Sequence, residues 1–278
     1  IAQPHQKAIF SDGTRRVTAA ALHPDPKIAM DEAAKWPYPI KGYPSYVDMI
    51  NDQKNLPDDQ KLDYILIVTP NFVHFDPAIK AIEAGIPVMC EKPLTVNREQ
   101  ADILADEAVK RGLPFAVAHT YLGHWTSWLS RFIVTSGLLG EIRWADASYI
   151  QGWLAKKSEK SANWRTDPKF SGGSLCLGDI GTHALDLTLW TMNNYEPEMV
   201  VGTKYHKLAP HANSANAWGP WDPEKFTVED SAFGFVRMKN GATIYLESSW
   251  ALNTLDVHEA KTILCGDKGG ADMMGEGG

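Results

Sequence analysis

One stretch decides the fold of this chain: LDYILIVT, residues Leu62 to Thr69, followed at once by Pro70 and Asn71. Its continuous apolar run has the length of a strand and stops at a proline, which predicts a strand buried on both faces. Such strands are typical of parallel sheets that helices cover on both sides. A helix from about Phe75 to Gly85 and a short strand at Ile86 to Cys90 are predicted to follow.

The same alternation of strand and helix extends in both directions along the chain. Strands are predicted at Arg16 to Leu22 and at Pro114 to His119, and a helix is predicted at Lys27 to Lys35. A further helix opens at Asn97, where Asn-Arg-Glu-Gln resembles a capping box, and it ends at Gly112. This alternation predicts an α/β fold, a doubly wound parallel sheet.

The pattern changes after about Tyr121. Helices are predicted at 126–136 and 182–190, and longer alternating strands at 142–151, 199–207, 231–238, 242–250 and 262–265. The Asn240-Gly241 pair between two of these strands is a hairpin signal, and Ala209 to Asp222 is predicted as a long loop. We therefore expect two domains: residues 1–121 with the parallel sheet, and residues 122–278, an α+β domain with a mostly antiparallel open sheet.

Composition excludes several classes of protein. The 278 residues are 44% hydrophobic and 22% charged, as in globular proteins, and the net charge of −7 argues against a nucleic-acid partner. No apolar run approaches the ~18 residues that a membrane helix needs. The three cysteines are too few and too scattered for a disulfide framework or a zinc site, which favours a reducing compartment, the cytoplasm.

Two short motifs follow neighbouring strands of the predicted parallel sheet. Thr69-Pro70-Asn71, with His74 after it, lies where ligands bind in open α/β sheets, at the carboxyl end of a strand and the start of a helix. A plain strand-to-helix turn and a helix-surface histidine are the alternatives. Glu91-Lys92-Pro93 follows the next strand, and a lysine there can stabilise a developing alkoxide or relay a proton. An ordinary surface turn would have the same sequence.

The third motif is Gly178-Asp179-Ile180-Gly181-Thr182-His183. Asp179 and His183 are four residues apart, so in a helix both side chains would lie on one face. A carboxylate that orients or polarises an imidazole serves acid–base chemistry. A metal pair and a helix N-cap aspartate beside a core histidine are the other readings. With no further ligand cluster nearby in the sequence, no metal site is expected.

Taken together and in this order, the three motifs resemble the signature of the glucose–fructose oxidoreductase/inositol dehydrogenase/MocA family, from about Pro4 to Gly270. Leu139 to Ile142, Gly266 to Gly270 and Asn163 to Pro168 resemble the family too. The resemblance implies an N-terminal Rossmann domain that binds NAD or NADP, and a C-terminal domain that covers the substrate and builds homo-oligomers, dimers or tetramers. It implies an oxidoreductase that transfers a hydride between the nicotinamide and a secondary hydroxyl of a sugar, sugar derivative or cyclic polyol.

The resemblance also assigns roles to individual residues. It implies three catalytic residues: Lys92, Asp179 and His183. It implies a set of cofactor-binding residues: Thr69, Pro70, Asn71, His74, Glu91, Lys92, Pro93, Trp164 and Arg165. It implies substrate contacts from Lys92, Tyr121, Arg165, Asp179 and His183.

Some features depart from the family pattern or leave its details open. The first strand and the Gly-rich phosphate loop are missing, and the chain begins at Ile1, so we expect truncation at both ends, with a lost N-terminal signal left open. The strand at Arg16 to Leu22 corresponds to the second strand of the family pattern. Asp25, shortly after it, gives a slight preference for NAD, whereas His23 could tolerate the 2′-phosphate of NADP. Elimination or hydrolysis of a glycoside by transient oxidation, and a dinucleotide-sensing regulator, are the alternative functions.

Overall fold

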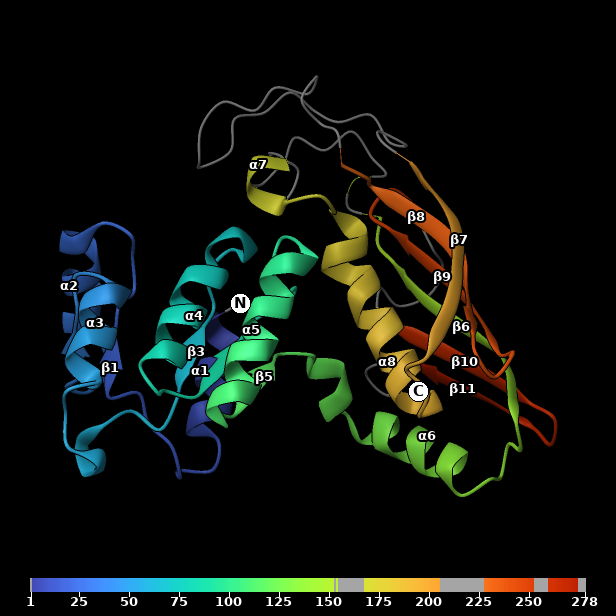
Figure 1. Cartoon of the computed structure of the whole chain (residues 1–278), viewed down its shortest axis with the longest axis horizontal. Helices are drawn as coiled ribbons and strands as arrows, with labels where there is room; N and C mark the ends of the chain where they lie inside the picture. Colours follow the sequence, from blue (N-terminus) through green and yellow to red (C-terminus); the bar gives the residue numbers. More distant parts are fainter. Residues whose placement is uncertain (1, 153, 155–167, 206–227, 253–259, 275–278) are drawn as a thin grey trace. The chain divides into compact units, whose positions relative to one another are not determined.

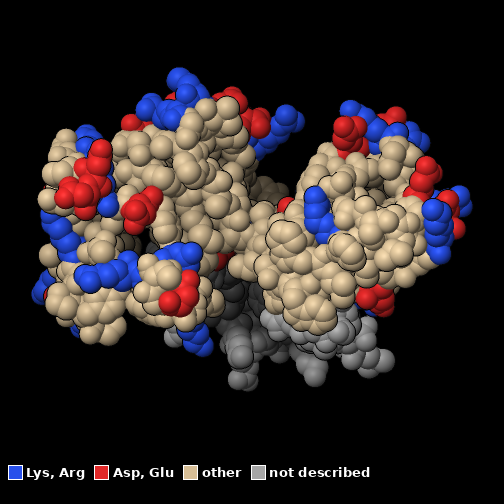
Figure 2. Space-filling model, turned by 90° about the horizontal axis from the view of Figure 1, so that it is seen from below, with Lys and Arg blue, Asp and Glu red and all other residues tan. Residues whose placement is uncertain are grey.

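Two units with different sheets make up the computed structural model (Figure 1), one spanning Ile1–Ala118 and the other His119–Gly278. The structure describes residues 2–152, 154, 168–205, 228–252 and 260–274. Within these ranges, no helix combines the length and the apolar character that crossing a membrane requires. Positive and negative side chains are intermixed on the face of the molecule in Figure 2, without a large area of one sign.

The first unit contains two parallel sheets and five α-helices. The strands are β1 (Ala19–Ala20), β2 (Lys41–Gly42), β3 (Ile65–Ile67), β4 (Val88–Cys90) and β5 (Phe115–Val117). The helices are α1 (Ala2–Phe10), α2 (Pro26–Ala34), α3 (Tyr46–Gln53), α4 (Phe75–Glu83) and α5 (Arg98–Arg111), with 3₁₀ turns at Asp58–Gln60 and Asn71–Val73. β1 pairs with β2, and β3, β4 and β5 form a second sheet in that order, all parallel. The predicted parallel α/β unit is confirmed.

Local sequence explains where the helices of this unit begin and end. The side chain of Asn97 accepts a hydrogen bond from the backbone N–H of Gln100 at 2.9 Å, and Gly112 ends α5 with φ of +62°. A left-handed residue at this position suits glycine because it has no Cβ. The sequence analysis missed α3, which is short and is capped by Ser45. The strands are shorter than predicted, because only three residues of each pair in the second sheet.

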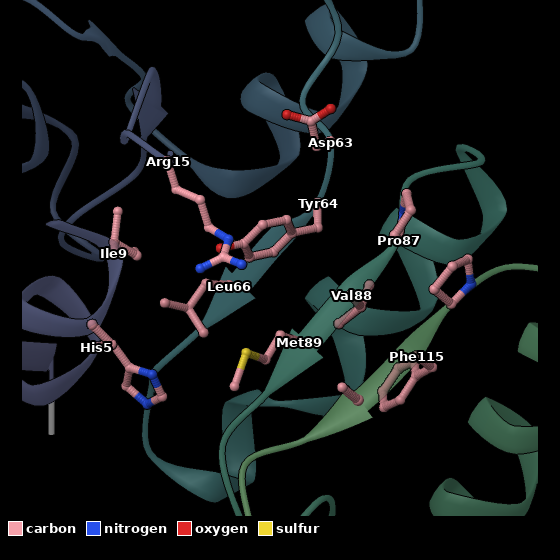
Figure 3. A pocket seen from close by; sticks show the side chains of 13 residues that line it. His5, Ile9, Arg15, Asp63, Tyr64, Leu66, Pro87, Val88, Met89 and Phe115 are labelled. Carbon is pink, nitrogen blue, oxygen red and sulfur yellow. The ribbon is translucent and has the colours of Figure 1, made fainter. Parts of the chain in front are cut away.

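The two faces of the three-stranded sheet are covered unequally. On one face Ile65, Ile67, Val88 and Cys90 are buried in a core shared with α4 and α5, as expected for a parallel sheet. The opposite face borders a cavity of about 640 Å³, which Figure 3 shows between the strands and α1. Its labelled wall residues are His5, Ile9, Arg15, Asp63, Tyr64, Leu66, Pro87, Val88, Met89 and Phe115.

The second unit is built on a six-stranded mixed sheet. Its strands are β6 (Ile142–Ile150), β7 (Pro197–Tyr205), β8 (Ser231–Met238), β9 (Thr243–Ser249), β10 (Lys261–Gly266) and β11 (Gly270–Met274). Their order is β11-β10-β6-β9-β8-β7, with β6 and β9 parallel and every other neighbouring pair antiparallel. The mostly antiparallel sheet is therefore confirmed. The sequence analysis missed β11, and its predicted loop at Ala209 to Asp222 lies outside the described residues.

Of the helices that the structure describes in this unit, α6 (Trp125–Thr135) and α8 (Thr182–Met192) contact the sheet, and aromatic side chains gather on its strands. The unit also contains α7 (Pro168–Ser171), a 3₁₀ turn at Thr120–Gly123 and a π-helical turn at Leu177–Gly181. α8 packs on β6 and β10, where the hydroxyls of Thr188 and Thr262 lie 2.7 Å apart. Trp144, Phe235 and Tyr245 form a ring cluster on adjacent strands, with Phe235 47% exposed.

Candidate functional site

In the first unit, the two predicted motifs leave the same edge of the three-stranded sheet. Thr69, Pro70 and Asn71 follow β3, and Lys92 is in the segment that follows β4. The two strands are parallel neighbours, and the backbone N–H of Glu91 donates to the carbonyl of Ile67 at 2.9 Å. The structure therefore brings these motifs together at the carboxyl edge, where open α/β sheets bind ligands.

His74 ties the two segments to each other. Its ring is 1% exposed, with Nδ1 2.9 Å from the carbonyl oxygen of Pro93 and Nε2 2.8 Å from that of Thr69. The alternative of a helix-surface histidine is therefore wrong. Because both ring nitrogens face backbone carbonyls, the imidazole braces the segments on either side of the edge.

Glu91 occupies a similar bracing position beneath Lys92. Its carboxylate is buried, with Oε1 2.6 Å from Nε2 of His5 on α1, and its Oε2 accepts a hydrogen bond from the backbone N–H of Lys92 at 3.1 Å. Buried charges are stable only when they are paired in this way. Glu91 thus fixes the backbone from which the half-buried Lys92 side chain extends.

The chemistry of this edge fits a nicotinamide dinucleotide. The buried Asn71 amide can donate and accept hydrogen bonds, and the Lys92 ammonium is a compact positive charge. Hydroxyl, amide and phosphate groups of a dinucleotide require donors and acceptors of these kinds. The sequence contains no G-x-G-x-x-G after a strand, so the residues at this edge account for only part of such a binding site.

In the second unit, His183 is the centre of a cluster of aromatic rings. It lies on α8, is 7% exposed, and its ring centroid is 4.9 Å from that of Tyr121 and 6.4 Å from that of Tyr149. The hydroxyls of these two tyrosines lie 2.9 Å apart, and the Gln151 amide donates to Tyr149 at 3.3 Å. His119 contributes a third ring, 6.1 Å from His183 and perpendicular to it.

Asp179 lies on the π-helical turn that leads directly into α8. The four-residue interval between Asp179 and His183 is therefore helical throughout, as the acid–base reading of the motif requires. The alternative of Asp179 as the N-cap of α8 is wrong, because Gly181 holds that position and makes no side-chain cap. Single π-helical turns within helical segments are frequently found at functional sites.

A carboxylate distant in the sequence holds this turn in place. Glu229 is fully buried, and its Oε1 accepts hydrogen bonds from the backbone N–H of Leu175 at 2.8 Å and of Leu177 at 3.1 Å, and from the hydroxyl of Ser174 at 2.7 Å. These bonds satisfy amides at the start of the helical segment. Burial and the neighbouring Glu229 carboxylate both raise the pKa of the Cys176 thiol, so this thiol stays neutral.

Sequence reasoning missed four residues of this unit. They are His119, Tyr149, Asp186 and Glu229. Asp186 follows His183 by three positions, and its carboxylate lies 3.5 Å from Nδ1 of His119. The helical interval from His183 to Asp186 was a signal that could have found this carboxylate. The other three come from distant parts of the chain and carried no local pattern.

Trp164 and Arg165 lie outside the described residues. Across the residues that the structure describes, no three His, Cys, Asp or Glu side chains are grouped as a metal site would require.

Known proteins match both units of the chain. The family model for the NAD-binding Rossmann fold of an oxidoreductase family matches residues 1–119, and the model for the GFO/IDH/MocA C-terminal domain matches residues 130–272. D-glucoside 3-dehydrogenase of Escherichia coli (strain K12) is 33% identical over 216 residues, which cover 77% of this chain and 59% of the relative. Levoglucosan dehydrogenase of Pseudarthrobacter phenanthrenivorans is 27% identical over 243 residues, 84% of this chain and 58% of the relative.

Solved structures give the same result. The crystal structure of an inositol dehydrogenase homolog from Azotobacter vinelandii, complexed with NAD+, matches with a TM-score of 0.83 and 26% identity, covering 97% of this chain and 66% of that chain. This chain spans less than two thirds of the length of these three proteins. The resemblance that the sequence motifs indicated is confirmed: the chain belongs to the Gfo/Idh/MocA oxidoreductase family, with its NAD-binding Rossmann domain and its C-terminal domain.

Proposed function

We propose that the protein is an NAD(P)-dependent dehydrogenase acting on a secondary hydroxyl of a sugar, sugar derivative or cyclic polyol. The single observation that carries the proposal is the setting of His183, a buried imidazole beside the rings of Tyr121 and Tyr149, on a helix that continues directly from the turn carrying Asp179. Family membership adds the cofactor chemistry, and relatives named for D-glucoside and levoglucosan support the substrate class.

Three residues perform the proton and charge chemistry of this proposal. His183, as neutral imidazole, takes the proton of the substrate hydroxyl. Lys92 stabilises the oxygen as it gains negative charge, and Asp179 holds either the imidazole or the hydroxyl. The nicotinamide, when bound, supplies a hydride acceptor for the substrate carbon.

The remaining roles concern binding. Cofactor contacts are assigned to Thr69, Pro70, Asn71, His74, Glu91, Lys92, Pro93, Trp164 and Arg165. For His74 and Glu91, the structure favours bracing of the segments that hold the cofactor. Tyr121 and Arg165 contact the substrate together with the catalytic residues. NAD is preferred over NADP, since Asp25 lies shortly after β1.

We also propose that the protein works in the cytoplasm as a homo-oligomer, a dimer or a tetramer. The three cysteines are free, which fits a reducing compartment. Phe235 on β8 and its cross-strand partner Val201 on β7 are exposed apolar side chains on one face of the sheet, which they offer for association of subunits.

The test is a survey of activity with the whole protein. NAD and NADP are supplied in parallel with a panel of glycosides, free sugars and inositols, and nicotinamide reduction is followed by its absorbance. Reduction with at least one sugar or polyol is expected, faster with NAD. Cofactor binding without reduction by any compound would reject the dehydrogenase and favour transient oxidation or a sensor.

A further inference from the structure

His119 and Asp186 lie beside His183 but have no part in the reaction proposed above. Nδ1 of His119 is 3.5 Å from Oδ2 of Asp186. The His119 ring meets the His183 ring edge to face, with centroids 6.1 Å apart and planes at 89°. Within the second unit, the Asp186 carboxylate therefore lies against the His119 imidazole, and the His119 imidazole lies against that of His183.

The fold fixes this order through two short elements. Asp186 lies three positions after His183 on α8, so both side chains are on one side of the helix. His119 immediately precedes the 3₁₀ turn that carries Tyr121, whose ring also contacts His183. One short turn and the residue before it therefore supply two of the rings that contact His183, those of His119 and Tyr121.

We propose that Asp186 and His119 are positioning residues for His183: the Asp186 carboxylate holds the His119 ring, and that ring packs edge to face against the His183 ring. This inference rests on the proposed function, in which His183 is the base. The pair sets the orientation of the His183 ring and favours the positive charge that His183 gains with the proton.

The charges around the pair agree with this role. Burial raises the pKa of Asp186, and the neighbouring His119 opposes that rise. A proton on the His119 imidazole therefore stabilises the ionised carboxylate, and the ionised carboxylate stabilises the protonated imidazole. Burial and Asp186 together raise the pKa of Tyr195 to about 12, which keeps its hydroxyl neutral. Among the residues that the structure describes, titratable or charged groups near His183 and Asp186 include His119, Tyr121, Tyr149, Asp179, Tyr195 and Arg131.

A purely structural role for Asp186 predicts something different. Loss of a structural carboxylate would lower stability and the amount of active enzyme without changing how the rate depends on pH. Loss of a positioning carboxylate makes His183 a weaker base, because its protonated form is less stabilised. The pH profile therefore separates the two roles.

The first arm of the test uses Asp186→Asn, His119→Gln and the double variant in the whole protein. Each single variant is expected to lower kcat about tenfold while KM changes less than about twofold, since neither residue touches substrate. In Asp186→Asn, the acid limb of the kcat profile is expected to move to lower pH by up to about one unit. The double variant is expected to be no worse than the worse single variant, as for residues that act as a unit.

Asp146→Asn is the matched control, because burial also raises the pKa of the Asp146 carboxyl, on β6. It is expected to leave kcat and its pH profile unchanged. A parental pH profile in Asp186→Asn, or additive losses in the double variant, would overturn the proposal.

The second arm of the test does not depend on enzyme activity. It can therefore reject this inference independently of the proposed function. Ring resonances of His119 and His183 are followed by NMR as the pH changes, in the parent and in Asp186→Asn, with His119→Gln giving the assignment. Both titration midpoints are expected to move to lower pH in Asp186→Asn. Unchanged midpoints overturn the inference, whereas an inactive parent with shifted midpoints overturns only the proposed function.

Discussion

The carboxylate of Glu229 accepts a hydrogen bond from the backbone N–H of Leu175 at 2.8 Å, across 54 positions of sequence. The same oxygen accepts from Leu177, two residues before Asp179. The turn that carries Asp179 is therefore held by a side chain that lies just before β8. Positions of the candidate acid–base pair depend on this long-range contact rather than on the helix alone.

Glu229→Ala is expected to destabilise the protein by about 2–3 kcal/mol, since it leaves buried amide donors without an acceptor. Glu229→Gln keeps an acceptor oxygen and is expected to lose less. Urea unfolding measures both. The control is Glu198→Ala, whose exposed pair with Arg237 is worth at most about 1 kcal/mol. Equal decreases in the free energy of unfolding for Glu198→Ala and Glu229→Ala would show that the hydrogen bonds of Glu229 to the turn do not stabilise the protein.

Lys92→Ala is expected to lower kcat by at least about a hundredfold, because the negative charge that develops on the substrate oxygen loses its partner. Cofactor binding, measured by quenching of protein fluorescence, is expected to weaken far less than turnover, because the other cofactor-binding residues remain. Lys110→Ala removes a lysine from the exposed face of α5 and should behave like the parent. Near-parental turnover in Lys92→Ala would reject the role of this lysine.

His183→Ala is expected to lose activity most severely near neutral pH. A general base accepts a proton only in its unprotonated form, and imidazole is the side chain suited to do this near neutral pH, which alanine cannot replace. At high pH hydroxide substitutes in part, and the difference between variant and parent narrows. The measurement is kcat against pH for both proteins. A constant ratio of their rates at every pH would count against His183 as the base.

The carboxyls of Asp146 and Glu247 should make stability fall as the pH rises. Burial raises the pKa of both groups, the Asp146 carboxylate raises that of Glu247 further, and the Lys261 ammonium opposes the rise in both. The stability that their protons contribute is fully present below the ordinary carboxyl pKa of about 4, and it is lost as the pH passes the raised values. Asp146→Asn should therefore raise the urea midpoint at neutral pH relative to the parent. A midpoint at or below that of the parent would contradict this.

The fold was predictable from the sequence because its signals are local. Buried parallel strands such as Ile65–Ile67 stand out as apolar runs, and the caps at Asn97 and Gly112 involve neighbouring residues. α3, β2, α7 and β11 were missed, because short segments with mixed polarity have weak periodicity.

The candidate site was only partly predictable, and the reason is distance along the chain. Thr69, Lys92 and His183 follow strands or start a helix, so the pattern marked them. The burial of His74 depends on carbonyls of Thr69 and Pro93, and the bonds of Glu229 cross more than fifty positions. No local pattern records such contacts, which form only when the sheet and helices assemble.

The most direct test of the central claim is the fate of the hydrogen on the reacting carbon. The whole protein is supplied with NAD and with a sugar or polyol that it oxidises, deuterated at that carbon, and the reduced nicotinamide is analysed by mass spectrometry and NMR. The account predicts one deuterium on the nicotinamide ring for each molecule of ketone formed. Product without deuterium in the released nicotinamide would contradict it, and so would the absence of any reduced nicotinamide across the panel.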